Sequence, residues 1–288
     1  MKLGLGTAQF GINYGVANSR GQVSKQGVID ILRLAESAGI CLIDTAVSYG
    51  SAEKTLGIIG ISGWSCITKL PPMPYGELNP KKWVESQIKE SLKRLNLTNF
   101  SAVLTHQSDD MLGSNSQEYL HGLQEMKNQG YIKDIGYSIY CPSVLEELTE
   151  VFWPNVIQTP YNVFDQRIKT SGWLDKLTVR GTKVHARSVF LQGLLLMAPH
   201  LRPSYFKKWE VHLSEWDAFV ASQELTAMEC ALNFVTGDKQ FNSVIVGVDS
   251  ANQLKELMGA YGKRCDLPAE RLEIADPDLI EPFRWQIA

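Results

Sequence analysis

The stretch Cys41-Leu-Ile-Asp-Thr-Ala-Val-Ser-Tyr-Gly50 carries the strongest structural signal in this chain of 288 residues. A short apolar run ends in Asp44, and Tyr49 follows five residues later in a small, turn-prone segment. A buried strand delivers polar groups in this way to the loop at its C-terminal end, which is the face of an α/β barrel where active sites are built. We therefore expect Asp44 and Tyr49 to lie at one end of a parallel sheet.

Strand-like and helix-like segments alternate on both sides of this stretch. The predicted strands cover residues 2–5, 40–43, 65–68, 100–104, 135–137, 156–158, 183–185 and 243–246. The predicted helices cover a segment capped by Ser24 and ended by Gly39, then residues 52–59, 80–95, 119–129, 143–151, 166–179, 213–221, 226–234 and 253–261. A long loop is expected over residues 188–204. Eight such units predict a closed (β/α)8 TIM barrel of the α/β class, forming a single domain over residues 1–288.

A doubly wound open sheet is the alternative fold. That fold would show a Gly-rich fingerprint, G-x-G-x-x-G, directly after the first strand. Gly4 and Gly6 instead lie at the strand itself, so the fingerprint is absent. The barrel is therefore the favoured prediction.

Composition indicates an ordinary globular protein. Hydrophobic residues make up 44% of the chain and the formal charge is -3, without a one-signed patch, so nucleic-acid binding gains little support. The five cysteines, Cys41, Cys66, Cys141, Cys230 and Cys265, are odd in number and form no C-x-x-C pair, which favours a reducing compartment. We see no signal peptide, and the longest apolar segment, residues 189–198, is about half the length of a membrane span. The prediction is a cytoplasmic protein with no membrane partner.

Four polar residues follow three successive strands. Asp44 ends the second strand, Lys69 the third, His106 follows the fourth, and Tyr49 lies in the loop after the second. A close ammonium stabilises a phenolate, so Lys69 could lower the pKa of Tyr49, while Asp44 would hold Lys69 charged and His106 could orient a carbonyl oxygen. Each residue alone is more often a cap, a packing residue or a solvated strand end. Together they suit proton delivery to a carbonyl group that receives a hydride.

The chain resembles the aldo/keto reductase family over nearly its whole length. The motifs that carry the resemblance are Gly4-Leu-Gly-Thr7, Ile43-Asp-Thr-Ala-x-x-Tyr-Gly-x-Ala-Glu53, Thr68-Lys69, Leu104-Thr-His106, Ile135-Gly-Tyr-Ser138, Val156-Ile-Gln-Thr-Pro-Tyr-Asn162, Gln192-Gly-Leu-Leu195, Ile245-Val-Gly247 and Gln253-Leu254. The resemblance implies an NADPH-dependent barrel enzyme that reduces aldehydes and ketones. Its catalytic tetrad would fall on Asp44, Tyr49, Lys69 and His106, with Tyr49 as the acid.

The resemblance also implies a cofactor site. Ser138 and Gln158 would hold the nicotinamide carboxamide, and the region of Gly247 would receive the adenosine phosphate. The residues assigned to the cofactor in this way are Gly6, Thr7, Ser138, Gln158, Arg187, Gln192, Gly193, Gly247, Ser250 and Gln253.

Three departures from the family pattern bear on that site. Ile139 stands where many relatives have Asn, and Arg187 stands where the family usually has a Tyr that stacks on the nicotinamide. Arg187 could stack on that ring and favour the neutral reduced cofactor, or it could reach an anionic substrate. Between Gly247 and Lys255 no cation is present, so Ser250 with the helix N-terminus could hold a 2′-phosphate, or Asp249 could bind a ribose hydroxyl. NADPH is expected and NADH is possible.

The version Arg-Ser-Val-Phe-x-Gln-Gly at residues 187–193 looks like a bacterial branch associated with surface-polysaccharide synthesis, which implies a sugar or nucleotide-sugar carbonyl as substrate. Two other functions are alternatives. A metal-dependent hydrolase is weak because the histidines form no H-x-H or H-E-x-x-H pattern, so no metal site is predicted. A cofactor-binding protein with little turnover, acting as a regulatory partner, is the other alternative.

Both a monomer and a small homo-oligomer are compatible with the motifs.

Overall fold

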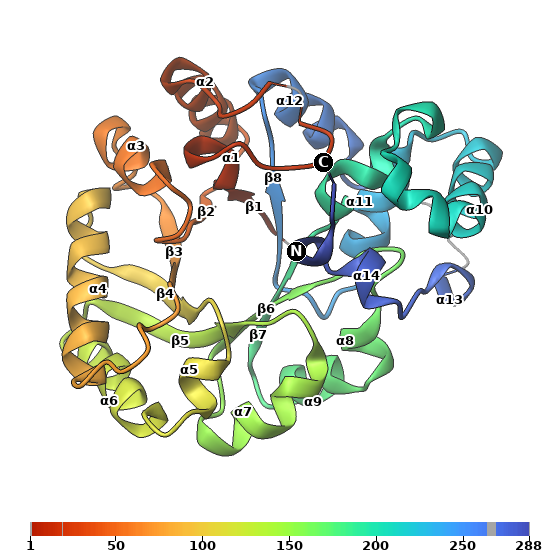
Figure 1. The fold of residues 1–288 in the computed structure, drawn as a ribbon. Helices are drawn as coiled ribbons and strands as arrows, with labels where there is room; N and C mark the ends of the chain where they lie inside the picture. The colour runs from red at the N-terminus through yellow and green to blue at the C-terminus, as the bar shows by residue number, and fades with distance from the viewer. Residues whose placement is uncertain (1, 19, 264–268, 288) are drawn as a thin grey trace.

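The computed structural model describes residues 2–18, 20–263 and 269–287, so Cys265 lies outside the described residues. Eight parallel strands close into a barrel in the order β1 to β8 (Figure 1). The strands are β1 Lys2–Gly6, β2 Leu42–Asp44, β3 Ser65–Leu70, β4 Phe100–Thr105, β5 Ile132–Ser138, β6 Val156–Pro160, β7 Lys183–Arg187 and β8 Ser243–Gly247. β1 closes the barrel on β8 through parallel pairs that run from Lys2 with Ser243 to Gly6 with Gly247. The (β/α)8 prediction is confirmed, and the open-sheet alternative is wrong.

Helices surround the barrel (Figure 1). The α-helices of the described residues are α1 Ala8–Gly11, α2 Lys25–Ser37, α3 Ala52–Ile59, α4 Pro80–Leu95, α5 Asp109–Leu112, α6 Ser116–Asn128, α7 Leu145–Val151, α8 Arg167–Thr170, α9 Trp173–Val179, α10 Glu210–Ser222, α11 Ala227–Gly237, α12 Ala251–Ala260, α13 Ala269–Leu272 and α14 Pro277–Ile280. Ser24 caps α2 as predicted, because its side chain accepts a hydrogen bond from the Gly27 N–H at 3.1 Å. None of the described helices is long and apolar enough to cross a membrane.

Two predicted segments differ from the structure. The single helix expected over residues 166–179 is two helices, because Gly172 between α8 and α9 adopts a left-handed φ of 76° that interrupts the helix. The expected loop over residues 188–204 contains two 3₁₀ segments, η2 Leu191–Leu196 and η3 Pro199–Leu201. Local apolar contacts organise this connection, since Leu191, Leu194 and Leu195 are buried in a cluster with α10 and α14.

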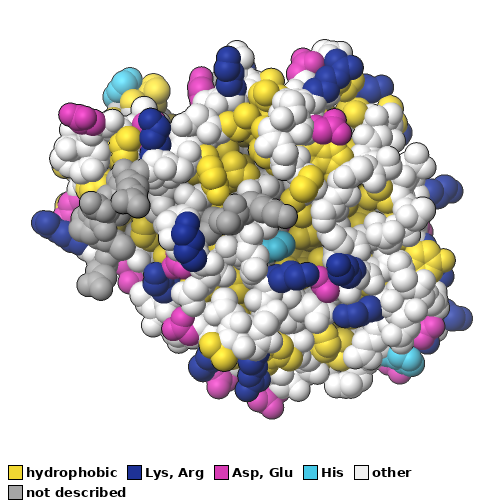
Figure 2. Space-filling view, turned by 180° about the vertical axis from the view of Figure 1, so that it is seen from behind, with side chains coloured by type: hydrophobic (Ala, Val, Ile, Leu, Met, Phe, Trp, Pro, Cys, Tyr) yellow, Lys and Arg dark blue, Asp and Glu magenta, His cyan; other side chains and the backbone are white. Residues whose placement is uncertain are grey.

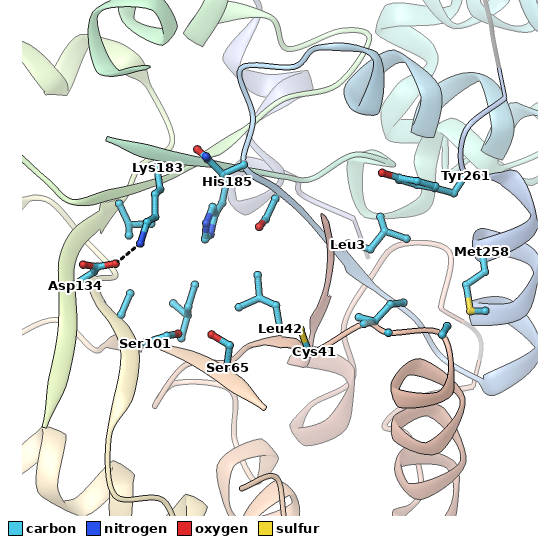
Figure 3. Close-up of a pocket in the computed structure, with 18 residues that line it drawn as sticks. Leu3, Cys41, Leu42, Ser65, Ser101, Asp134, Lys183, His185, Met258 and Tyr261 are labelled. Atoms are coloured by element: carbon cyan, nitrogen blue, oxygen red, sulfur yellow. Dashed lines mark hydrogen bonds and ion pairs between the residues drawn. The ribbon is translucent and has the colours of Figure 1, made fainter. Parts of the chain in front are cut away.

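A cavity opens at the N-terminal ends of the barrel strands. It has a volume of about 720 Å³ and is lined by residues that include Leu3, Leu42, Ala102 and Ser243 (Figure 3). Barrel interiors are usually filled by bulky branched side chains. Here small residues such as Ala102 and Ser243 leave space. Figure 2 shows hydrophobic side chains in a hollow on the face opposite to that of Figure 1, with Lys and Arg side chains nearby.

Polar side chains also line this lower cavity. Lys183 pairs with Asp134 at 2.7 Å, and His185 lies beside them on β7 (Figure 3). His185 is only 5% exposed, and burial lowers the pKa of its imidazole to about 4, against the opposing charge of Asp44. The His185 Nδ1 atom is buried and has no hydrogen-bond partner among the described residues. His185 is therefore a neutral side chain near pH 7.

This burial predicts acid sensitivity of the fold. In the unfolded chain His185 is protonated below its ordinary pKa of about 6.5, whereas in the native state it stays neutral down to about pH 4. The free energy of unfolding therefore falls as the pH decreases from about 6.5 to about 4. We expect His185→Gln to reduce the slope of unfolding free energy against pH between these values by about 1.4 kcal/mol per pH unit. Urea unfolding at several pH values measures the slope.

His200→Gln, which removes an exposed imidazole, is the matched control. An unchanged slope in His185→Gln, or an equal change in His200→Gln, would contradict the prediction.

Candidate active site

A second cavity, of about 460 Å³, lies at the C-terminal ends of the strands. Asp44, Tyr49, Lys69 and His106 all line it, so the fold brings the predicted tetrad to one place. The loop that carries Tyr49 turns back on α1 at Gly50, where φ is 56° and an added Cβ would lie 2.5 Å from the Gly11 carbonyl oxygen. Only glycine fits this contact, so the turn after β2 holds Tyr49 over the cavity.

Lys69 is the centre of the polar contacts in the cavity. Its Nζ lies 2.6 Å from Asp44 Oδ2, 3.1 Å from the Thr45 carbonyl oxygen and 3.5 Å from the Tyr49 hydroxyl. The Lys69 and Asp44 side chains are only 1% and 4% exposed. The Gln158 side-chain amide donates to the other Asp44 oxygen at 2.7 Å. Because an ammonium has three donors, these contacts orient Lys69 completely, with one donor directed at Tyr49.

The pKa of Tyr49 differs from the sequence expectation. Burial raises this pKa above its usual value, the Asp44 carboxylate raises it further, and Arg187 opposes them. A lowered pKa was expected from Lys69, whose charge Asp44 balances at 2.6 Å, whereas burial and Asp44 raise the pKa. Burial also lowers the pKa of Lys69, against the attraction of Asp44. Tyr49 is therefore fully protonated near neutral pH and can donate its hydroxyl proton.

His106 lies beside Tyr49 at the end of β4. The ring centroids of the two residues are 5.9 Å apart with an interplanar angle of 79°. His106 Nδ1 lies 2.9 Å from the Ser48 hydroxyl, which leaves Nε2 without a partner among the described residues. Burial, followed by the charges of Lys69 and Arg187, lowers the pKa of His106 to about 3. The imidazole is therefore neutral, with one nitrogen held by Ser48 and the other available to a ligand.

The residues predicted for the cofactor divide into two groups. Those that line the cavity are Gly6, Thr7, Ser138, Gln158, Arg187, Gln192, Gly193, Gly247 and Gln253. Ser250 is not among the lining residues, because its hydroxyl caps α12 by accepting from the Gln253 N–H at 3.2 Å. The Gln253 side chain in turn accepts from the Asp249 N–H at 2.6 Å. The structure brings nine of the ten predicted residues to the cavity and uses the tenth to build its border.

The cavity residues fit a nicotinamide nucleotide. The Gln158 side-chain N–H already donates to Asp44, but the Gln158 Oε1 atom is buried and has no partner in the described chain. This oxygen can therefore accept a hydrogen bond from the N–H of a carboxamide. At the other end of the cavity, Gly247 and Asp249 lead into α12, a helix of ten residues. The N–H groups of such a helix N-terminus attract phosphate oxygens. The donor set therefore suits a ligand with an amide at one end and phosphate at the other.

Sequence reasoning missed several residues of this site. Ser48, Tyr14 and Tyr140 line the cavity, and the Tyr14 hydroxyl accepts from the Gln192 side chain at 3.3 Å. The position of Ser48 next to Tyr49 was the only sequence signal among them. Arg20 also matters, because its charge opposes the burial that raises the pKa of Asp249. Arg20 is thus a cation whose charge acts on a segment that has no cation of its own between Gly247 and Lys255.

The metal-hydrolase alternative gains no support. Among the described residues no group of three or more His, Cys, Asp or Glu side chains could hold a metal ion.

Comparison with known proteins shows a wide likeness at low identity. The chain is 26% identical over 265 residues to the L-glyceraldehyde 3-phosphate reductase of Escherichia coli K12, covering 78% of this chain and 76% of that protein. It is 24% identical over 295 residues to the NADH-specific methylglyoxal reductase of the same strain, covering 90% of this chain and 89% of that protein.

A solved aldo-keto reductase from Bacillus halodurans, in its holo form, has the same fold with a TM-score of 0.75 at 21% identity, over 99% of this chain and 95% of that one. The profile of the "Aldo/keto reductase family" matches residues 2–276. The chain therefore belongs to the aldo/keto reductase family.

Proposed function

We propose that this protein is an NAD(P)H-dependent oxidoreductase that reduces an aldehyde or ketone, with Tyr49 as the proton donor. Family membership supports the reaction class. The observation that carries the residue assignment is the contact of Lys69 with both Asp44 and the Tyr49 hydroxyl in one cavity. Nothing in the cavity favours the low-turnover alternative, because all four tetrad side chains are present and close together.

Each tetrad residue has a role that its surroundings support. NAD(P)H, when bound, supplies the hydride. Tyr49 holds its proton near neutral pH and donates it to the carbonyl oxygen, and Lys69 stabilises the resulting phenolate from 3.5 Å. Asp44 keeps the buried Lys69 charged. His106 Nε2 orients the carbonyl oxygen while Ser48 holds the other ring nitrogen.

The cofactor contacts follow from the two ends of the cavity. Ser138 and the unpartnered Gln158 oxygen hold the carboxamide. The remaining contacts come from Gly6, Thr7, Gln192, Gly193, Gly247 and Gln253, and Ser250 acts by fixing the start of α12.

The substrate and the location are finer parts of the proposal. A sugar or nucleotide-sugar carbonyl stays the expected substrate from the sequence of residues 187–193, while the two relatives described above are named for glyceraldehyde 3-phosphate and methylglyoxal. Cytoplasmic location is supported by the free thiols of Cys41, Cys66 and Cys141.

The proton-donor role is tested by Tyr49→Phe. We expect kcat/KM for aldehyde reduction to fall by roughly 10²- to 10⁴-fold, since the variant loses the acid and keeps the ring. Affinity for reduced cofactor, measured by quenching of tryptophan fluorescence, should stay within about threefold of the parent value, since one hydroxyl contact is the only change. Tyr137→Phe is the control, because Tyr137 is a buried tyrosine on β5 whose hydroxyl bonds the Phe152 carbonyl oxygen and does not line the cavity. Full activity of Tyr49→Phe would remove the assignment.

The buried pair is tested by Lys69→Met with and without Asp44→Asn. Lys69→Met leaves a carboxylate buried without its cation, so it should reduce the free energy of unfolding by about 3–5 kcal/mol and reduce turnover sharply. The double variant removes the uncompensated charge and should recover most of the stability but none of the turnover. Urea unfolding and steady-state kinetics measure the two effects. If the double variant regained activity, Lys69 would have no role in proton transfer.

The cofactor preference is tested by titration with NADPH and NADH. A 2′-phosphate carries negative charge, so the Arg20 guanidinium near Asp249 should favour NADPH. We expect Arg20→Gln to reduce the ratio of NADPH to NADH affinity, and Asp249→Asn to increase it, each by roughly 3- to 30-fold. If neither reduced cofactor binds at millimolar concentration, the reductase proposal fails. Binding with ratios that neither substitution changes would exclude Arg20 and Asp249 from recognition of the cofactor tail.

A further inference from the structure

Arg187 is a cation in the active-site cavity without an acidic partner. It ends β7 and lines the same cavity as Tyr49 and His106. No carboxylate of the described residues lies within 4 Å of its guanidinium. Its positive charge acts on the reaction centre, because it opposes the rise in the pKa of Tyr49 and adds to burial and Lys69 in lowering the pKa of His106. A partly buried guanidinium without a counterion is costly unless a ligand supplies the negative charge.

The side chain of Arg187 is held in one orientation. Its guanidinium stacks on the Tyr140 ring, with the central carbon 4.4 Å from the ring centroid. One terminal nitrogen donates to the Ile139 carbonyl oxygen at 3.0 Å, and the other donates to the Ser188 hydroxyl at 3.1 Å. A guanidinium has five N–H donors, so three remain for a ligand. Arg187 is thus preorganised, with free donors in the plane of the group.

The platform under Arg187 is itself supported. The Phe283 ring packs edge-on against Tyr140 at 4.7 Å, and Arg167 donates to the Tyr140 carbonyl oxygen at 3.0 Å. Two segments distant in sequence therefore position the ring on which Arg187 rests. Such support is typical of residues whose orientation matters for recognition.

The charges around this platform balance one another. The Arg167 guanidinium forms two hydrogen bonds with Asp165 and an ion pair with Glu281, and Glu281 also pairs with Arg284. Inside the cavity, Asp44 pairs with Lys69 at 2.6 Å. With His106 neutral, Arg187 is a charge near the reaction centre that forms no ion pair among the described residues. Its charge also favours the ionised form of Asp165, whose carboxylate Arg167 already binds.

We propose that Arg187 binds an anionic group, a carboxylate or a phosphate, on the carbonyl substrate. The guanidinium plane offers parallel donors to two oxygens of such a group, and Tyr140 fixes the direction from which the group is held. The substrate class is accordingly an aldehyde or ketone that carries a negative charge. This inference rests on the proposed reductase function and specifies its substrate.

The test compares matched charged and neutral aldehydes with the intact enzyme and reduced cofactor. The first pair is 4-formylbenzoate and its methyl ester, and the second is glyceraldehyde 3-phosphate and glyceraldehyde. We expect the parent enzyme to prefer the charged member of at least one pair in kcat/KM by roughly 10- to 100-fold, mainly through KM. A larger preference in the first pair indicates a carboxylate site, and a larger preference in the second pair indicates a phosphate site.

Arg187→Met should abolish this preference, and Arg187→Lys should retain part of it because the charge remains without the planar fork. Arg180→Met is the matched control, since Arg180 also stacks on an aromatic ring, Trp153 at 4.1 Å, but does not line the cavity. Equilibrium titration of each variant with 4-(hydroxymethyl)benzoate, the charged product, gives a readout independent of turnover, and affinity should fall in Arg187→Met.

Three results would overturn the inference. They are no preference for the charged aldehyde in the parent enzyme, an unchanged preference in Arg187→Met, and an equal loss of preference in Arg180→Met. Failure of the parent enzyme to reduce any of the four aldehydes with either cofactor is a different outcome, which would count against the proposed function itself.

Discussion

The buried contact between Lys69 and Asp44 is the interaction on which the active site depends. An ammonium and a carboxylate lie 2.6 Å apart and almost fully out of water, where either charge alone would be strongly destabilising. Gln158 from β6 and the Thr45 carbonyl oxygen after β2 complete the hydrogen bonds of the pair. Three strands are therefore tied together at one end of the barrel, and the same contact directs Lys69 at Tyr49.

The pair also explains the electrostatics of the cavity. Since Asp44 balances Lys69, the catalytic end carries little net charge, and burial governs the pKa of Tyr49 in the upward direction. In the proposed reaction, the positive charge of Lys69 stabilises the negative charge that develops on the Tyr49 phenolate, 3.5 Å away. Arg187 forms no ion pair among the described residues, and its charge acts on both Tyr49 and His106; the proposed anionic substrate would supply the matching negative charge.

The two ends of the barrel serve different purposes. Polar residues at the C-terminal ends of the strands line one cavity, where hydrogen bonds join Lys69, Asp44 and Gln158. At the N-terminal ends, small residues such as Ala102 leave a cavity bordered by the neutral His185 and by the pair of Lys183 with Asp134.

The barrel, the order of its elements and the tetrad could be read from the sequence, since apolar strands alternate with helical periodicity and the polar residue at each strand end is local information. Only the tertiary structure decided what depends on distance through space. It formed the stack of Arg187 on Tyr140, joined Gln158 to Asp44, and raised the pKa of Tyr49 through burial. Burial and charge pairing are sums over neighbours from many strands and loops, so a linear pattern that names the catalytic residues cannot specify the field in which they work.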